Sequence, residues 1–459
     1  MYPDLKYLEI ELPEDILKLK WAGYYDRAIK LIDERISRDI PFALKQRLII
    51  EKDILKRMPV MYIYSFDEAL KELQENIEGF TAEELQELSD SGAVDWIFID
   101  GKPYFRDNIL ENTLKTSKDA VKRVKKPELA ADSSQRANML RETMETMKKD
   151  GHLSYRFKVR ETIKPSDEAR RIGEVAKVHL PLPLEYSQVK NVKILETSHT
   201  PRYICGDNAL AKTIYFEEKL ESDTEFSVTY EFETHMKYND PKPEDVSPDQ
   251  PHFYTEEHLP HIRFTNYIKE LLHEIVVDEK NPLVKAHLIY NYITGHANYS
   301  FVRPYFLITD IPGYLATGWK GDCGIQALLF ITLCRAAGIP ARWQSGLYCN
   351  PMSEVGSHDW AEFYVAPFGW LYADCSFGGG AHRAGDEERR QFYFGNLDPF
   401  RIPANCQYQA EMYPLKEHLR NDPYDNQTGE IEYSDRGLWD NELVHTQELL
   451  SYEVIPYNK

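Results

Sequence analysis

The chain has few cysteines for its length, six in 459 residues. They are Cys205, Cys323, Cys334, Cys349, Cys375 and Cys406. Because none of them forms a Cys-x-x-Cys pair or another spacing typical of zinc ligands, we predict no metal and no other cofactor. A disulfide framework is not expected either, since such frameworks belong to short chains that are much denser in cysteine.

Long hydrophobic runs are also missing. No stretch approaches the roughly 18 apolar residues that a membrane-spanning helix requires. The first residues, Met1 to Lys6, have neither the basic start nor the apolar centre of a secretory signal. The sequence therefore predicts a cytoplasmic protein that does not bind membranes.

Positive charge is scarce, with 55 Lys and Arg against 75 Asp and Glu and a net charge of −20. A surface of that sign repels phosphate backbones and anionic lipids, so we expect no binding to nucleic acid. Hydrophobic residues make up 42% and charged residues 28% of the chain, which is typical of a globular protein. We see no internal repeat and no phosphate-binding glycine loop, and the oligomeric state stays open.

Cys323 opens a long apolar segment that ends near Gly338 and Pro340. Asp322 is a favourable N-cap residue, and the positions after it are almost all apolar, which predicts a helix buried on all sides. Cys323 would lie in its first turn, where free N–H groups and the helix dipole favour an anion, so we expect a lowered thiol pKa. The same N–H groups could bind an oxyanion. Cys334 is interpreted as a small buried hydrophobic residue.

A hairpin follows, with strands from His358 to Val365 and from Trp370 to Asp374 around a turn that contains Pro367. This length brings Asp374 close to His358, where a carboxylate can fix the tautomer and orientation of the imidazole. Asp359 should point to the opposite face of its strand, as a solvated or hairpin-edge carboxylate. A thiol, an imidazole and a carboxylate in this order are the parts of a thiol-dependent acyl-transfer site.

Four motifs together resemble the transglutaminase-like superfamily. They are Gly-Asp-Cys-Gly before the helix, the segment 334–342, His-Asp-Trp-Ala-Glu at 358–362, and Trp-Leu-Tyr-Ala-Asp at 370–374. The resemblance covers about residues 255–400 and implies a papain-like α+β core in a multidomain member of bacterial type. It also implies that Cys323 is the nucleophile, His358 the general base and Asp374 the orienting carboxylate of an acyl-enzyme route. Cys375 and Ser376, which follow Asp374, depart from the usual family pattern.

The resemblance further implies an aromatic oxyanion donor upstream of the cysteine. Tyr299 is the candidate, while Trp319 and Trp360 lie near the motifs and are candidates for contacts with the oxyanion or the substrate. Two histidines, His258 and His261, stand among acidic residues, and we interpret their segment as a surface turn or a part of the cleft. The glycine run 378–380 is interpreted as a mobile loop or a linker.

The rest of the chain divides by composition and period. Residues 1–150 are predicted to be mainly helical, with capping boxes at Ser65–Glu68 and Thr81–Glu84 and a small hairpin at 96–105. Residues 151–240 show the period of two that is typical of strands and predict a small β-sandwich. The catalytic core is expected at 252–400, and residues 401–459 are expected to be an extension that packs on it.

The predicted function is a thiol-dependent amide hydrolase, a cysteine peptidase or amidase, that acts on a peptide-like or glycopeptide substrate. An alternative with the same triad is a protein-glutamine transamidase that cross-links proteins. A third reading is a non-catalytic binding or scaffold protein with a relic core. The presence of all three triad residues favours an enzyme, and a peptide or protein substrate is the only partner that we expect.

Overall fold

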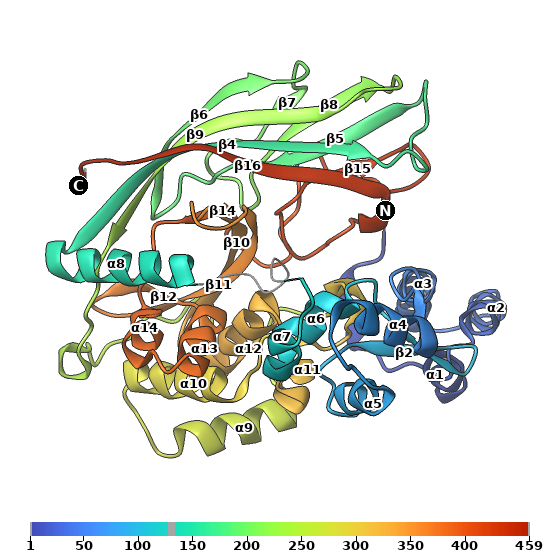
Figure 1. Cartoon of the computed structure of the whole chain (residues 1–459), viewed down its shortest axis with the longest axis horizontal. Coiled ribbons are helices and arrows are strands. Elements are labelled where there is room, and N and C mark those ends of the chain that lie inside the picture. Colours follow the sequence, from blue (N-terminus) through green and yellow to red (C-terminus); the bar gives the residue numbers. More distant parts are fainter. Residues whose placement is uncertain (1, 127–133, 458–459) are drawn as a thin grey trace.

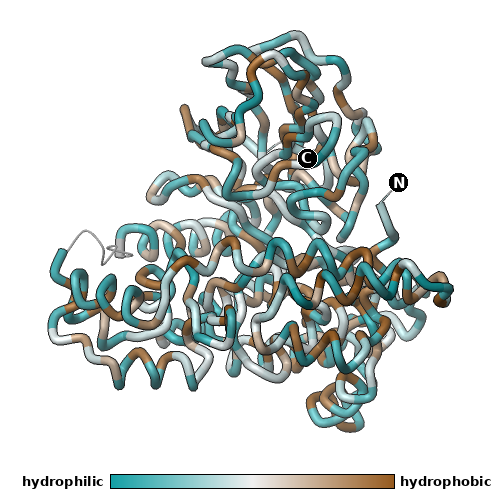
Figure 2. The backbone as a smooth tube through the Cα atoms, turned by 90° about the vertical axis from the view of Figure 1, so that its right-hand side faces the viewer, coloured by the Kyte–Doolittle hydropathy of each residue, from teal (hydrophilic) through white to brown (hydrophobic). Residues whose placement is uncertain are grey.

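The computed structural model describes residues 2–126 and 134–457, and its fold class is α+β. Figure 1 shows three parts: a helical N-terminal region on one side, a β-sandwich across the top, and below the sandwich a core in which helices pack on a sheet. Turned by 90°, the sandwich forms an upper lobe above the other two parts (Figure 2). No helix in the described ranges combines the length and apolarity needed to cross a bilayer.

The N-terminal region consists mostly of short helices. They are α1 (Glu14–Trp21), α2 (Tyr25–Ile36), α3 (Phe42–Arg57), α4 (Phe66–Asn76), α5 (Ala82–Asp90), α6 (Ile109–Thr116) and α7 (Lys118–Lys122). Both predicted capping boxes are confirmed, at the starts of α4 and α5. The predicted hairpin is also confirmed, as β2 (Trp96–Ile99) and β3 (Lys102–Phe105), which form a three-stranded sheet with β1 (Tyr64–Ser65).

The β-sandwich has two four-stranded sheets, with the strand orders β16-β4-β9-β6 and β15-β5-β8-β7. The strands are β4 (His152–Pro165), β5 (Val175–Pro181), β6 (Val189–Thr197), β7 (Tyr203–Ile204), β8 (Thr213–Lys219), β9 (Phe226–Lys237), β15 (Glu430–Glu432) and β16 (Leu443–Val454). Helix α8 (Ser134–Asp150) leads into β4.

The C-terminal residues do more than pack on the core, which corrects the expected role of residues 401–459. They supply β14 (Arg401–Asn405) to the core sheet and β15 and β16 to the two sheets of the sandwich. Burial alternates from residue to residue over the first half of β16, and a matching period of two in the sequence could have indicated a strand there. The partner strand is β4, far away in sequence, and a sequence pattern does not identify such a partner.

The core sheet has five strands in the order β13-β12-β11-β10-β14. Besides β14, these are β10 (Ala341–Tyr348), β11 (Gly356–Val365), β12 (Gly369–Ala373) and β13 (Phe394–Gly395). The helices of the core are α9 (Asn266–Val276), α10 (Pro282–His296), α11 (Ile311–Gly318), α12 (Cys323–Ala336), α13 (Cys375–Arg383) and α14 (Glu387–Phe392). Helix α12 packs against β11, for example through Phe330 and Phe363, whose ring centroids are 5.8 Å apart.

Two expectations about the core were wrong. The glycine run 378–380 lies inside α13 rather than in a loop, because Asp374 caps the helix and Gly378 packs closely on α10. A Cβ atom on Gly378 would lie 1.9 Å from the Tyr290 hydroxyl, so only glycine fits there. His261 is not on a surface turn but fully buried, and its Nδ1 accepts a hydrogen bond from the backbone of Ile311.

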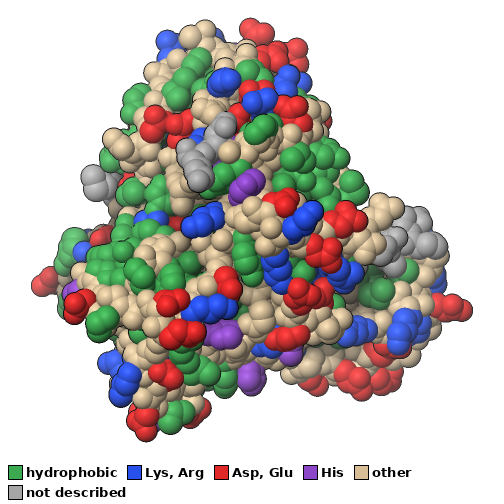
Figure 3. Space-filling view, turned by 90° about the vertical axis from the view of Figure 1, so that its left-hand side faces the viewer, with side chains coloured by type: hydrophobic (Ala, Val, Ile, Leu, Met, Phe, Trp, Pro, Cys, Tyr) green, Lys and Arg blue, Asp and Glu red, His purple; other side chains and the backbone are tan. Residues whose placement is uncertain are grey.

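Charges of both signs are mixed on the face of the molecule that Figure 3 shows. Elsewhere in the described residues, partly exposed side chains form ion pairs, such as Arg171 with Asp435 at 2.8 Å. Exposed pairs of this kind contribute little to stability. The charges that position the site are therefore the buried ones.

Candidate active site

Cys323 is the first residue of α12, as the sequence predicts. The Asp322 side chain caps the helix by accepting a hydrogen bond from the backbone N–H of Ile325 at 3.2 Å. The helix is buried along its length, and Cys323 itself is 9% exposed. The thiol therefore stands beside the free N–H groups of a helix start, with a narrow approach from solvent.

The thiol contacts Asp359. Cys323 Sγ lies 3.6 Å from Asp359 Oδ2, and the other carboxylate oxygen accepts a hydrogen bond from Gln427 Nε2 at 2.7 Å. The expectation that Asp359 is a solvated carboxylate was wrong, since it is 3% exposed. It does point away from His358, but that face of β11 is covered by α12 and is not open to solvent.

The expected lowering of the thiol pKa was also wrong. Burial raises the pKa of Cys323 well above its ordinary value, and the negative charges of Asp359 and Asp322 raise it further. Burial and the charges of Asp322 and Asp422 likewise raise the pKa of Asp359. With its pKa raised in this way, the thiol is neutral near pH 7.

His358 and Asp374 lie together on the other side of β11. The hairpin is formed as predicted, and Asp374 follows its second strand directly. His358 Nε2 lies 2.7 Å from Asp374 Oδ2, and both side chains are buried. Because Nε2 is occupied by the carboxylate, Nδ1 is the nitrogen that remains free for proton transfer.

Asp374 is held as a carboxylate by several partners. Its Oδ1 accepts hydrogen bonds from the backbone N–H of Phe377 at 2.9 Å and from the Ser376 hydroxyl at 3.0 Å. Its Oδ2 lies 2.8 Å from Arg401 Nη1. Burial alone would raise the pKa of Asp374, but the charges of Arg401 and His358 outweigh it and hold that pKa well below the ordinary value.

Arg401 was not found from the sequence. It is 1% exposed, and it also lies 3.1 Å from Asp398 Oδ2. Its guanidinium group stacks on Phe377, with 4.5 Å to the ring centroid. The residue lies 27 positions after Asp374 on β14, and no local motif marks it. Only the pairing of β14 with β10 brings it to the site.

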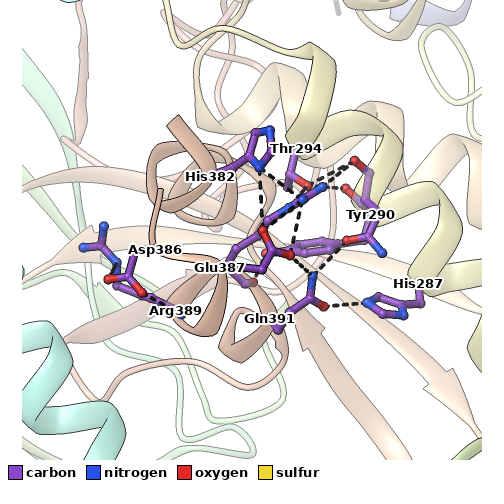
Figure 4. Close-up of polar contacts among 10 residues, drawn as sticks. His287, Tyr290, Thr294, His382, Asp386, Glu387, Arg389 and Gln391 are labelled. Carbon is purple, nitrogen blue, oxygen red and sulfur yellow. Dashed lines mark hydrogen bonds and ion pairs between the residues drawn. The ribbon is translucent and has the colours of Figure 1, made fainter. Parts of the chain in front are cut away.

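The helices behind Asp374 are joined by a polar network (Figure 4). The Tyr290 hydroxyl donates to the carbonyl of Arg390 at 2.7 Å, and Arg390 Nε donates to the Thr294 hydroxyl at 2.9 Å. His287 Nε2 and Gln391 Oε1 are 2.6 Å apart. These contacts fix α14 on α10, and Arg383 of α13 donates to the carbonyl of Ala297 just after α10 at 2.7 Å. Because Asp374 caps α13, the attachment of α13 to α10 also supports the position of Asp374.

The described residues thus form two pairs and not one continuous chain of contacts. His358 pairs with Asp374, whereas the hydrogen-bond partner of Cys323 Sγ within residues 2–126 and 134–457 is Asp359. The two pairs are adjacent in the chain, because His358 and Asp359 are consecutive residues of β11. Within the described residues no hydrogen bond joins Cys323 Sγ to His358, so the side chains must rearrange before a proton could pass between them.

Two tyrosines belong to segments that lie beside the start of α12. Burial raises the pKa of Tyr299 well above its ordinary value, and the charge of Cys323 is the next cause, so its hydroxyl stays protonated beside the thiol. Tyr305, which the sequence did not indicate, donates from its hydroxyl to Asp322 Oδ1 at 2.5 Å. A Cβ atom on Gly324 would lie 2.2 Å from the Tyr305 hydroxyl, so this tyrosine lies close against the start of α12.

The two tryptophans proposed from the sequence have other surroundings. Trp360 is fully buried, and its Nε1 donates to Gln344 Oε1 at 2.6 Å, so a direct contact with substrate was a wrong expectation. Trp319 ends α11, and its ring packs on those of Tyr292 and His296 of α10 at 5.4 and 5.3 Å. Both side chains support the elements of the site.

The sequence of the core matches a known family. The family model described as the transglutaminase-like superfamily matches residues 269–375, so this part of the chain is a transglutaminase-like core. An uncharacterized protein of Haemophilus influenzae is 27% identical over 285 residues, which cover 52% of this chain and 76% of the relative.

Solved structures show weaker similarity. A protein of Cytophaga hutchinsonii described as a candidate cysteine protease has a TM-score of 0.41 and 13% identity, over 67% of this chain and 94% of that one. The periplasmic domain of TgpA from Pseudomonas aeruginosa has a TM-score of 0.28 and 15% identity, over 50% of this chain and 98% of that one. Similarity at this level does not extend to function.

Proposed function

We propose that this chain, with its transglutaminase-like core, is a thiol-dependent amide hydrolase that acts on peptide-like substrates. In this proposal Cys323 is the nucleophile, His358 the general base and Asp374 the carboxylate that orients the imidazole. The observation that carries the proposal is the buried contact of 2.7 Å between His358 Nε2 and Asp374 Oδ2, one residue along β11 from the carboxylate that touches the thiol.

The first step is transfer of the thiol proton to His358 Nδ1. It requires Cys323 Sγ to leave the Asp359 oxygen, which lies 3.6 Å away. The imidazolium that forms is stabilised by Asp374, and the thiolate attacks the carbonyl carbon of the amide. His358 then returns the proton to the leaving amine, which gives the thioester on Cys323.

The oxyanion of the tetrahedral intermediate needs donors close to the thiol. The free N–H groups at the start of α12 supply one set. The Tyr299 hydroxyl is the candidate for another donor, because backbone hydrogen bonds hold its neighbours Asn298 and Ser300 beside Gly321, and burial keeps the hydroxyl protonated by raising its pKa. Water, activated by His358, then attacks the thioester, releases the acid and regenerates the thiol.

Hydrolysis is favoured over transamidation by the positions of the tryptophans. An amine acceptor competes with water only in a cleft with apolar walls that excludes water. Trp343 is 1% exposed and Trp360 is fully buried, so neither can form a wall that an entering amine would touch. Without such walls the acyl-enzyme is open to water, which is the most abundant nucleophile.

The test traps the intermediate and follows both products. The full chain is incubated with a library of glutamine-containing peptides and a fluorescent primary amine, and adducts and products are read by mass spectrometry. We expect an acyl adduct on Cys323 and free acid or cleaved peptide, all lost in Cys323→Ala and kept in the matched control Cys334→Ala. Stable incorporation of the amine that depends on Cys323 would favour a transamidase, and no adduct on Cys323 with any peptide would reject the proposal.

A further inference from the structure

A pocket in the N-terminal region is lined by none of the residues assigned to the candidate active site. It has a volume of about 250 Å³ and is lined by residues of α1, the start of α2 and β2, by Met58 at the end of α3 and by Arg303 of the core. Figure 1 shows these elements at the blue end of the chain. The volume is slightly below the range of about 300–1,000 Å³ that is typical of sites for drug-sized ligands, so it suits a small metabolite.

The walls of this pocket are aromatic. Trp21 is 62% exposed at its mouth and Phe98 is 37% exposed. Trp96 packs edge-on against Phe98 with 5.1 Å between centroids, and the Tyr25 hydroxyl donates to the Phe98 carbonyl at 2.8 Å, so the wall is held in place. Large aromatic faces that are fixed and exposed to a pocket suit a flat or ring-shaped group.

Lys20 lines the same pocket and is only 5% exposed. Its Nζ lies 2.9 Å from Glu51 Oε1, but the other oxygen of Glu51 already accepts a hydrogen bond from Arg47 at 2.8 Å. Glu51 is therefore shared between two cations. Burial lowers the pKa of Lys20 in spite of Glu51, which indicates that its charge is incompletely compensated.

Arg303 is a second cation in the lining of the pocket. Its Nε and Nη2 donate to the Asp95 carboxylate at 3.1 and 2.5 Å. Its Nη1 lies 3.9 Å from the sulfur of Met58, which is a poor acceptor. The charged side chains that line the pocket, together with those linked to them through ion pairs, are Lys20, Arg47, Glu51, Asp95 and Arg303. These five comprise three cations and two carboxylates, a net charge of +1, and the charge of the buried Arg106, which also acts on Asp95, adds to it.

We propose that this pocket binds a small carboxylate that carries a ring. The carboxylate would accept hydrogen bonds from Lys20 Nζ and Arg303 Nη1, and the ring would pack between Trp21 and Phe98. A single negative charge neutralises the set of five charged side chains, and a planar carboxylate matches an arginine that still has a free donor. Nothing in this proposal depends on the reaction at Cys323.

The first experiment measures binding to the full chain by calorimetry and by tryptophan fluorescence, since Trp21 and Trp96 line the pocket. The probes are benzoate, cyclohexanecarboxylate and glucuronate, each beside its neutral counterpart benzamide, cyclohexanecarboxamide or glucose. We expect at least one carboxylate to saturate one site and its neutral counterpart to bind at least about tenfold more weakly, because a hydrogen bond to a charged group is lost. Equal binding of the neutral compound, or no saturation by any carboxylate, would overturn the proposal.

Variants locate the site. Lys20→Met keeps the aliphatic stem and removes the charge, with Lys18→Met on the same helix but on the surface as its control. Trp21→Ala removes the wall at the mouth, with the equally exposed Phe42→Ala outside the pocket as its control. We expect both pocket variants to weaken binding about tenfold or more and both controls to leave it unchanged. If Lys20→Met fails to fold, Trp21→Ala decides, and unchanged binding in that variant contradicts the assignment.

Discussion

The two faces of strand β11 carry opposite halves of the candidate site. On one face His358 and Asp374 lie within 2.7 Å of each other, and the buried guanidinium of Arg401 lies 2.8 Å from the same carboxylate. On the other face Cys323 touches Asp359, and the nearby carboxylates of Asp322 and Asp422 add charge of the same sign. Within the described residues, neither Asp359 nor Asp322 forms an ion pair.

This difference indicates that the base is preorganised and the nucleophile is not. Asp374 stays ionised at neutral and mildly acidic pH because the charges of Arg401 and His358 lower its pKa, so the imidazole keeps its orienting partner over that range. The thiol is held neutral by burial and by Asp359 and Asp322. Formation of the thiolate then requires either a shift of the proton to His358 or a positive group in the cleft.

The largest expected effect is loss of the base. His358→Ala should lower the rate of hydrolysis of a peptide that acylates Cys323 by about 10²–10⁴-fold, because the thiol has no other neutral acceptor for its proton. The control is His273→Ala, an exposed histidine on α9 outside the site. Steady-state rates with matched protein concentrations measure the effect, and a rate within twofold of the unchanged protein would remove His358 from the mechanism.

The next effect is on stability and concerns the face of β11 on which Arg401 balances the charges of Asp374 and Asp398. Arg401→Met leaves Asp374 and Asp398 buried without their cation, so we expect the free energy of unfolding to fall by about 3–5 kcal/mol. Urea unfolding followed by circular dichroism measures it. Arg436→Met, which breaks an ion pair of 2.7 Å at the surface, is the control and should cost about 1 kcal/mol or less. Equal losses in the two variants would contradict the comparison of the two faces.

The elements near Cys323 could be predicted from the sequence because their signals are local. The N-cap Asp322, the apolar run and the stop at Gly338 define α12, and the turn around Pro367 defines the hairpin of β11 and β12. The two capping boxes in the N-terminal region are equally local. In each case the residues that determine the element lie within about one helical turn of its end.

The environment of the thiol could not be predicted in the same way. Asp359 was expected to be solvated because strand alternation gives its face but not what covers that face. Arg401, Tyr305 and Gln427 reach the site from β14, from the segment before α11 and from the C-terminal part, and no spacing in the sequence connects them. The thiol pKa depends on these distant groups, which is why its predicted direction was wrong.

Removal of the charge beside the thiol should change its reactivity. Asp359→Asn takes away the nearest negative charge, so the pKa of Cys323 should fall and iodoacetamide should alkylate it at lower pH. In the unchanged protein the raised pKa leaves little thiolate at neutral pH, and alkylation should rise only under alkaline conditions. Mass spectrometry of the peptide that contains Cys323 measures the rate.

Cys375 is the internal reference for this experiment, because its pKa is raised by burial and by Asp374 on the other face. The exposed Asp278 supplies a control variant, Asp278→Asn. Faster alkylation of both cysteines would indicate a loosened fold. An unchanged pH profile of Cys323 in Asp359→Asn would show that Asp359 does not set its pKa.

The smallest expected effect concerns Gln427. Its neutral amide is a hydrogen-bond partner of Asp359, whereas on the other face of β11 the partner of Asp374 is the charged guanidinium of Arg401. Gln427→Ala removes the hydrogen bond of 2.7 Å to Asp359 Oδ1, and we expect the free energy of unfolding to fall by about 1 kcal/mol. In the background Asp359→Asn the same change should cost less, because a neutral amide gains less from that donor than a carboxylate does. A double-mutant cycle by urea unfolding gives this coupling, with Gln447→Ala on β16 as the control. A coupling of zero would mean that Gln427 does not stabilise a charged Asp359, as expected if burial keeps this side chain protonated and neutral.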